Sequence, residues 1–115
     1  MTTLSEAVDD ELWSAVGDPI RRRLLDLLLG HGSATSTTLS EQVPVTRQAV
    51  AKHLAVLDRA GLVHSAAEGR ERRYRIDEPR FAHAVAQLTT VGNAWDARLS
   101  RIKRLAESIQ HERRQ

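Results

Sequence analysis

Apolar residues recur along the chain at the three- and four-residue spacing of amphipathic helices, in stretches separated by residues that start or stop helices. The first stretch has an apolar residue at every fourth position, at Leu4, Val8, Leu12 and Val16. The second begins at Asp18-Pro19, which places an N-cap before a proline at the first helical position. Gly30 and Gly32 are expected to end this helix. Its three arginines, Arg21 to Arg23, are expected on its outer side.

Two short helices joined by a tight turn are predicted next. The stretch from Thr35, a cap-type residue, to Val43 is predicted to be helical, and Pro44 closes it because proline disfavours helix in the residue before it. The following helix covers residues 47–60, with Thr46 as its cap. Helices joined this tightly cannot pack antiparallel and must cross steeply, which is the geometry of a helix-turn-helix.

Two short strands are predicted after these helices, at residues 62–66 and 72–76, around a turn at Glu68-Gly69. On the second strand, alternation places Tyr74 and Ile76 on one face and Arg73 and Arg75 on the other. A two-stranded hairpin is marginal alone, so this one must lean on the helices. The predicted fold is therefore a winged helix-turn-helix, mainly α, with about five helices and a two-stranded wing.

The chain from Pro79 to its end contains no helix breaker, and its apolar or small residues repeat with steps of four and three. They are Phe81, Val85, Leu88, Gly92, Trp95, Leu99, Ile102, Ala106 and Ile109. Such a repeat is typical of a seam between two helices, although its first turns are expected to pack on their own domain. We therefore predict a homodimer. The interface residues predicted from this repeat are Leu88, Gly92, Trp95, Leu99 and Ile102.

The 115 residues are expected to form one domain. Residues 1–17 would supply an N-terminal helix, residues 18–78 the helix-turn-helix and wing, and residues 79–115 the C-terminal dimerisation helix. A small domain buries a low fraction of its surface, so a second subunit would help its stability.

The helix predicted at residues 47–60 has two unlike faces. Val50, Leu54 and Leu57 share one face, and Gln48, Lys52, Ala55 and Arg59 share the other. Glutamine pairs with adenine and arginine or lysine with guanine, while a small residue lets the backbone approach the groove. Base readout is therefore expected from Arg47, Gln48, Ala51 and Lys52. The alternative is an ordinary charged surface helix, but the outward face of the first two turns carries no acid for i, i+4 pairs.

Contacts to DNA phosphates are expected on both sides of this helix. The free N–H groups at a helix start suit a phosphate oxygen. The segment GRERRYR, residues 69–75, carries four arginines against one glutamate, although the whole chain has a net charge of only +2. The predicted phosphate contacts are Thr35, Ser36, Thr46, His53, Arg70, Arg72, Arg73 and Arg75. The expected partner is double-stranded DNA with an inverted-repeat operator.

Composition narrows the remaining function classes. The chain has no cysteine, which excludes disulfides, thiolate metal sites and a cysteine nucleophile. It has no Gly-rich phosphate loop, nucleophile elbow or convergent His/Asp/Glu group, so we expect neither an enzyme nor a cofactor. The acidic N-terminus lacks the pattern of a secretory signal, and no apolar run approaches the roughly 18 residues of a membrane span. A cytoplasmic protein without a membrane partner is expected.

Three segments together resemble the winged-helix repressors of the arsenic-repressor (ArsR) family. They are DPIRRRLLDLL, LSEQVPVTRQAVAKHLAVLDRAGLV and EGRERRYRID, which lie between Trp13 and Phe81. The resemblance implies a homodimeric, sequence-specific transcriptional regulator, usually a repressor, that dimerises through its first and last helices. On this basis residues 1–17 are expected to be an N-terminal dimer helix, and Leu4, Val8 and Leu12 join the predicted interface. By the family pattern, Thr46–His53 begin the recognition helix and Arg70–Arg75 lie in the wing.

The chain departs from the family pattern at the residues that sense metals. Many relatives carry a cysteine pair in the helix before the recognition helix, where this chain reads TTLSEQV. On the last helix, His83 and His111 lack a matching Asp-x-His. Zinc needs three or four converging ligands. We therefore predict no metal site, and two alternatives stay open: a metal-responsive repressor with non-thiol ligands, and a winged helix that binds proteins. The effector is unknown.

Overall fold

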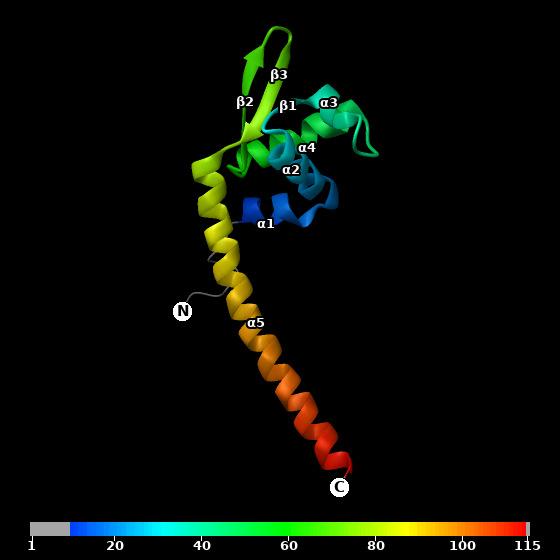
Figure 1. Cartoon of the computed structure of the whole chain (residues 1–115), viewed down its shortest axis with the longest axis vertical. Coiled ribbons are helices and arrows are strands. Elements are labelled where there is room, and N and C mark those ends of the chain that lie inside the picture. The colour runs from blue at the N-terminus through cyan, green and yellow to red at the C-terminus, as the bar shows by residue number, and fades with distance from the viewer. Residues whose placement is uncertain (1–9, 115) are drawn as a thin grey trace.

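The computed structural model describes residues 10–114. In chain order its elements are α1 (Asp10–Gly17), α2 (Pro19–His31), β1 (Ala34–Thr35), α3 (Ser36–Ser40), α4 (Arg47–Arg59), β2 (Val63–Glu68), β3 (Glu71–Ile76) and α5 (Glu78–Arg114). The shorter elements gather at one end of α5, and the rest of α5 extends away from them (Figure 1). The molecule is therefore elongated, 72 × 33 × 21 Å. This architecture confirms the predicted winged helix-turn-helix with a long C-terminal helix.

The helices begin where the cap residues predict. The carboxylate of Asp18 accepts hydrogen bonds from two backbone N–H groups at the start of α2, including that of Arg21 at 3.1 Å. Thr35 and Thr46 cap α3 and α4 through their side-chain oxygens. At its other end α2 continues through residue 30 and is capped by Gly32, whose φ of 82° favours glycine.

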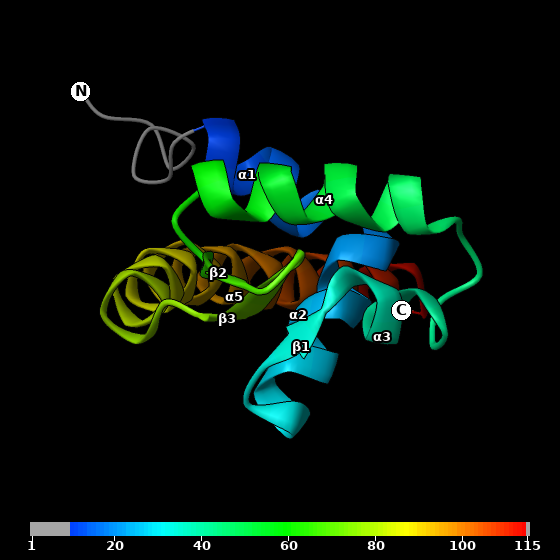
Figure 2. The ribbon, with the colours of Figure 1, turned by 90° about the horizontal axis from the view of Figure 1, so that it is seen from above.

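The helix α3 is shorter than predicted. It ends at Ser40 rather than Val43, and the Ser40 hydroxyl donates to the carbonyl of Thr37 at 2.7 Å. Such a side-chain bond competes with the helical hydrogen bonds of the backbone. Val43 is buried from within the turn and anchors it to the core. Figure 2 shows the resulting turn at one end of α4, and both α1 and α2 pack against this helix.

The strands form an antiparallel sheet in the order β1-β3-β2. The hairpin turns at Gly69-Arg70, where Gly69 has a φ of 62°. Tyr74 and Ile76 are half-buried against the core while Arg75 is exposed, as the alternation predicts, but Arg73, which was predicted on the same face as Arg75, is half-buried. The strand β1 was not predicted. It pairs Ala34 with Tyr74, and two residues show no periodicity of their own from which a strand could be read.

The core lies between the four short helices, the sheet and the start of α5. Its buried residues include Ala15, Leu24, Leu28, Leu39, Val50, Leu54, Leu57, Leu62 and Val63. The helix α5 contributes Ala84 and Val91, whereas Val85 and Gly92 of the predicted repeat are exposed. Phe81 and Leu88 of the repeat are half-buried against the core, so the first turns pack on their own domain through a face that partly overlaps the predicted seam. Among residues 10–114, no helix combines the length and apolar character needed to cross a membrane.

This packing corrects one predicted dimer contact, Leu12, and leaves Leu88 a prediction. Leu12 is only 2% exposed and belongs to the core of its own protomer, because α1 packs against α2 and α4. Leu88 is half-buried against the same core. Leu4 and Val8 lie outside the described residues.

Candidate nucleic-acid interface

The two faces of α4 differ as the sequence predicts. Val50, Leu54 and Leu57 have an exposed fraction of 0% and fasten the helix to the domain. The residues on its other side are exposed: Arg47, Gln48, Ala51, Lys52, Ala55 and Arg59. The first turn of α4 contains no acidic residue. All four predicted base-reading residues thus share one surface, where long hydrogen-bonding side chains flank a small alanine.

The starts of α3 and α4 carry three of the predicted phosphate contacts. Thr46 is exposed, and its Oγ1 accepts a hydrogen bond from the Ala49 N–H at 3.1 Å. Ser36 is half-buried at the first position of α3. Thr35 is only 7% exposed, and its Oγ1 accepts from the Thr38 N–H at 3.2 Å. The prediction for Thr35 is therefore corrected, since a buried capping hydroxyl cannot reach a phosphate.

The arginines of the wing fall into two groups. Arg70, Arg72 and Arg75 are exposed, and the Nε of Arg72 donates to Ser65 Oγ at 3.0 Å. A side chain tied to its neighbouring strand in this way reaches less far than an untethered one. These three arginines give the wing a positive outer surface, as predicted.

Arg73 differs from the other wing arginines because protein groups already engage it. Its guanidinium is ion-paired with the carboxylate of Glu68 on the opposite strand. Its Nη1 also donates to Ser33 Oγ at 3.3 Å. Arg73 is half-buried as a result. A phosphate contact by Arg73 would require this ion pair to break.

His53 and Arg21 lie together, which the sequence did not indicate. His53 is half-buried on α4, and its Nδ1 is 3.1 Å from Nη1 of Arg21. Arg21 was expected on the outer side of α2, but it is half-buried and folds back toward α1. Arg22 and Arg23 are exposed as expected. One sequence signal could have indicated the position of Arg21. The last turn of α1 contains no cation, and Arg21 is the first basic residue that follows it.

The same region contains a perturbed carboxyl group. Hydrogen bonding from the Arg21 backbone N–H lowers the pKa of Asp18, and the Ile20 N–H and the charge of Arg21 act in the same direction. Partial desolvation opposes them. Asp18 therefore remains ionised at the start of α2, where the helix dipole favours a negative charge.

Beyond Val91, the long helix exposes a stripe of large apolar side chains. Its members are Trp95, Leu99, Ile102, Leu105 and Ile109, whose exposed fractions range from 45% to 62%. The guanidinium of Arg98 lies 5.1 Å from the ring centre of Trp95. Leu105 was not predicted as part of this surface, because it does not fall on the repeat of four- and three-residue steps. A contiguous apolar surface of this kind is typical of an interface with another protein.

No three His, Cys, Asp or Glu side chains within residues 10–114 are arranged to hold a metal ion. His83 and His111 both lie on α5, but the 28 residues between them correspond to about 42 Å along a helix. They cannot converge on one ion within a single chain.

Comparison with known proteins assigns the chain to a family. A family model described as a helix-turn-helix domain matches residues 16–66. The HTH-type transcriptional regulator Rv2034 of Mycobacterium tuberculosis is 33% identical over 86% of this chain and 89% of its own length. The regulator CmtR of the same species is 34% identical over 81% of this chain and 78% of its own length.

A solved structure agrees with these relatives. The ArsR-like transcriptional regulator from Rhodococcus sp. RHA1 superimposes with a TM-score of 0.67 at 38% identity, over 94% of this chain and 98% of that chain. These similar proteins are transcriptional regulators and not enzymes. The chain belongs to the ArsR family of winged helix-turn-helix transcriptional regulators.

Proposed function

We propose that this regulator is a homodimeric repressor that acts in the cytoplasm and binds an inverted-repeat operator, one half-site per subunit. The exposed face of α4 is the observation that carries the proposal. The major groove of B-DNA admits one helix, and here the buried face of α4 leaves the opposite one free to enter it. Arg47, Gln48 and Lys52 are the base-reading side chains, and Ala51 permits close approach.

Phosphate contacts on either side would hold α4 in the groove. Ser36 and Thr46 lie at the starts of the two helices, where backbone N–H groups attract phosphate oxygens. On the wing, the exposed arginines are the proposed contacts: Arg70, Arg72 and Arg75. Arg73 joins them only if its ion pair with Glu68 opens.

The proposed dimer partner is a second copy of the chain, paired along the apolar stripe of α5. Helix-turn-helix dimers place their recognition helices about 34 Å apart, one turn of DNA, so two subunits are needed to read an inverted repeat. The stripe supplies the apolar surface for that pairing, since Trp95, Leu99 and Ile102 have no core of their own to enter. Repression would follow from occupation of a promoter.

The test begins with genomic fragments that the purified protein retains. Their shared sequence defines the operator, and mobility shifts then compare operator with scrambled duplex across a range of salt concentrations. With about four phosphates neutralised per subunit, the logarithm of the binding constant of the dimer should fall against log salt with a slope of about −7. Equal affinity for both duplexes at every salt concentration would refute a sequence-specific regulator and favour a winged helix that binds proteins.

A further inference from the structure

One arginine connects the end of α1 to the recognition helix. The Nε of Arg21 donates to the carbonyl of Ala15 at 3.1 Å, and its Nη2 donates to the carbonyl of Ser14 at 2.7 Å. Its Nη1 is 3.1 Å from Nδ1 of His53. Three of the five guanidinium N–H donors are therefore directed at two other helices.

The contacts to α1 satisfy groups that a helix end leaves open. The last four carbonyls of a helix lack partners within it, and both accepting carbonyls, of Ser14 and Ala15, belong to this last turn of α1. A cation at a helix C-terminus is also favoured by the helix dipole. Because α1 has no basic residue in its own last turn, Arg21 provides that charge from α2. This fixes the position of the guanidinium.

The contact between Arg21 and His53 on α4 determines which nitrogen of the imidazole carries the proton. A guanidinium donates and cannot accept, so Nδ1 of His53 must be the acceptor. His53 is therefore neutral in this arrangement and carries its proton on Nε2. The ring is half-buried and lies one residue from Lys52, which belongs to the proposed base-reading face. A shift of α4 that carries the His53 ring toward or away from Arg21 therefore moves that face as well.

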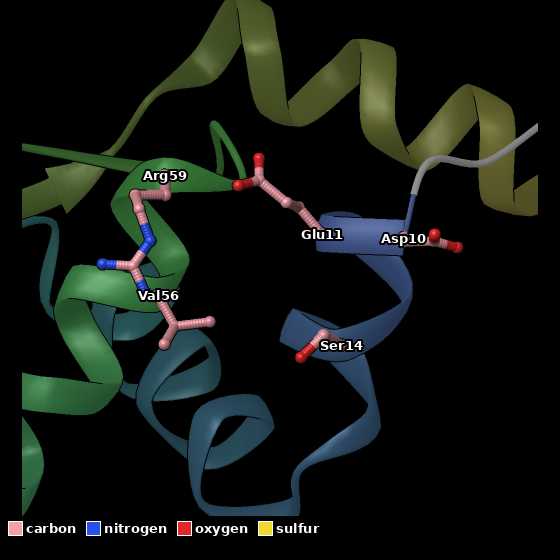
Figure 3. Close-up of a pocket in the computed structure, with 5 residues that line it drawn as sticks. All are labelled: Asp10, Glu11, Ser14, Val56 and Arg59. Carbon is pink, nitrogen blue, oxygen red and sulfur yellow. The ribbon is translucent and has the colours of Figure 1, made fainter.

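A groove beside the bridge leaves part of the space between α1 and α4 unfilled. It has a volume of about 250 Å³ and is lined by Asp10, Glu11, Ser14, Val56 and Arg59. Figure 3 shows Glu11 and Arg59 on opposite walls, one from each helix. Ser14 belongs to both features, since its carbonyl accepts from Arg21. Along this groove, side-chain packing therefore leaves α4 room to shift against α1, and the bridge lies at the same junction.

We propose that Arg21 is a positioning residue for DNA reading, acting through His53 to hold α4 at a set position against α1. The inference rests on the proposed role of α4 as the base-reading helix. It is distinct from the phosphate contact predicted for His53, which only the Nε2–H, and not the Nδ1 that faces Arg21, could make. Arg21 and His53 thus determine operator preference without touching a base.

The experiment measures the affinity of full-length variants for the operator fragment and for a scrambled duplex at one salt concentration. Arg21→Ala should lower the ratio of the two affinities about tenfold, in line with the loss of a charged hydrogen bond, and change scrambled binding by less than about threefold. Arg22→Ala is the matched control, because the Arg22 side chain is exposed on the neighbouring position, and it should leave the ratio unchanged.

Two further variants separate the bridge from the cap of α1. His53→Ala leaves the bonds to Ser14 and Ala15 in place, so it should fold, lower the ratio similarly and keep the wild-type salt slope. Combined with Arg21→Ala it should add little, because both changes remove the same contact. His53→Gln, which retains an acceptor, should recover part of the ratio.

The imidazole nitrogen chemical shifts of His53 provide a readout that does not involve DNA. The wild type should show an accepting Nδ1, and Arg21→Ala should remove that signature while Arg22→Ala keeps it.

Two results would overturn the inference. One is a ratio of operator to scrambled affinity in Arg21→Ala that equals the wild-type ratio. The other is a His53→Ala variant that binds both duplexes more weakly by the same factor and with a shallower salt slope. A wild-type protein without operator preference would instead refute the proposed function.

Discussion

The guanidinium of Arg73 is ion-paired with the carboxylate of Glu68 across the wing, so the most basic segment of the chain is partly neutralised by the protein itself. Replacing Glu68 by glutamine should release Arg73 toward DNA phosphates. We expect affinity for operator and scrambled duplex to rise alike by about threefold, since an exposed ion pair is worth at most about 1 kcal/mol. Filter binding at several salt concentrations checks this, and a steeper salt slope should accompany the gain.

Arg73→Ala is the companion variant. If Arg73 is occupied by Glu68, its removal should weaken DNA binding less than Arg70→Ala, whose side chain is exposed at the hairpin turn. A larger loss from Arg73→Ala would show that the ion pair opens on DNA.

Gln48→Ala should relax base preference. A bidentate pair with a base contributes about 1–3 kcal/mol of discrimination. At one operator position, the loss of affinity caused by a base change should therefore be about tenfold smaller than in the wild type. Binding to a panel of operators with single base changes measures this. Gln110→Ala, an exposed glutamine far along α5, serves as control and should leave the pattern intact. A uniform loss across the panel would make Gln48 a phosphate contact instead.

Leu99→Glu should give monomers. Leu99 is 57% exposed at the middle of the apolar stripe of α5, where a charge would be desolvated in the paired state. Losing the second subunit should reduce operator affinity about a hundredfold or more. Light scattering reports the mass of the particle. Ser100→Glu is the control, because it places the same charge on the next residue, and it should leave the dimer intact. A dimer that survives Leu99→Glu would show that the interface lies elsewhere than on this stripe.

Asp18→Ala should make stability depend less on pH. Because the pKa of Asp18 in the folded protein lies below the ordinary value of 3.8, its contribution is fully present above that value and is lost as pH falls through the folded pKa. At neutral pH the substitution should cost about 1 kcal/mol, as expected for an N-cap. Urea unfolding at pH 7 and near pH 3 compares the two proteins, and the difference between them should shrink in acid. A difference independent of pH would mean that the charge of Asp18 does not matter.

Gly61→Ala and Gly30→Ala should change stability in opposite directions. Gly61 has a φ of 84°, and an added Cβ would lie 2.7 Å from Nε of Arg80. The side chain of Arg80 can move, but the left-handed backbone should still cost about 1–2 kcal/mol. Gly30 lies within α2, with no atom within 4 Å of an added Cβ. Alanine there should stabilise by up to about 1 kcal/mol. Thermal unfolding tests both, and equal effects would contradict the backbone explanation.

Local sequence signals explain most of the helices and strands of this protein. Helix starts at Asp18, Thr35 and Thr46 follow from side chains that satisfy backbone N–H groups two or three residues away. The two faces of α4 follow from the helical period, and the hairpin follows from alternation around a turn at Gly69. These signals act within a few residues, so the sequence by itself determined the order of the helices and of the two wing strands, the winged-helix architecture and the exposed face of α4.

Tertiary structure alone decided the remaining features. The strand β1 exists because Ala34 pairs with Tyr74, forty residues later. Leu12 belongs to the core rather than to a dimer seam because α1 packs on its own domain. Arg21 and His53 meet from different helices. Each outcome depends on which distant groups the fold brings within hydrogen-bonding or packing distance, and no periodicity along the chain encodes that distance.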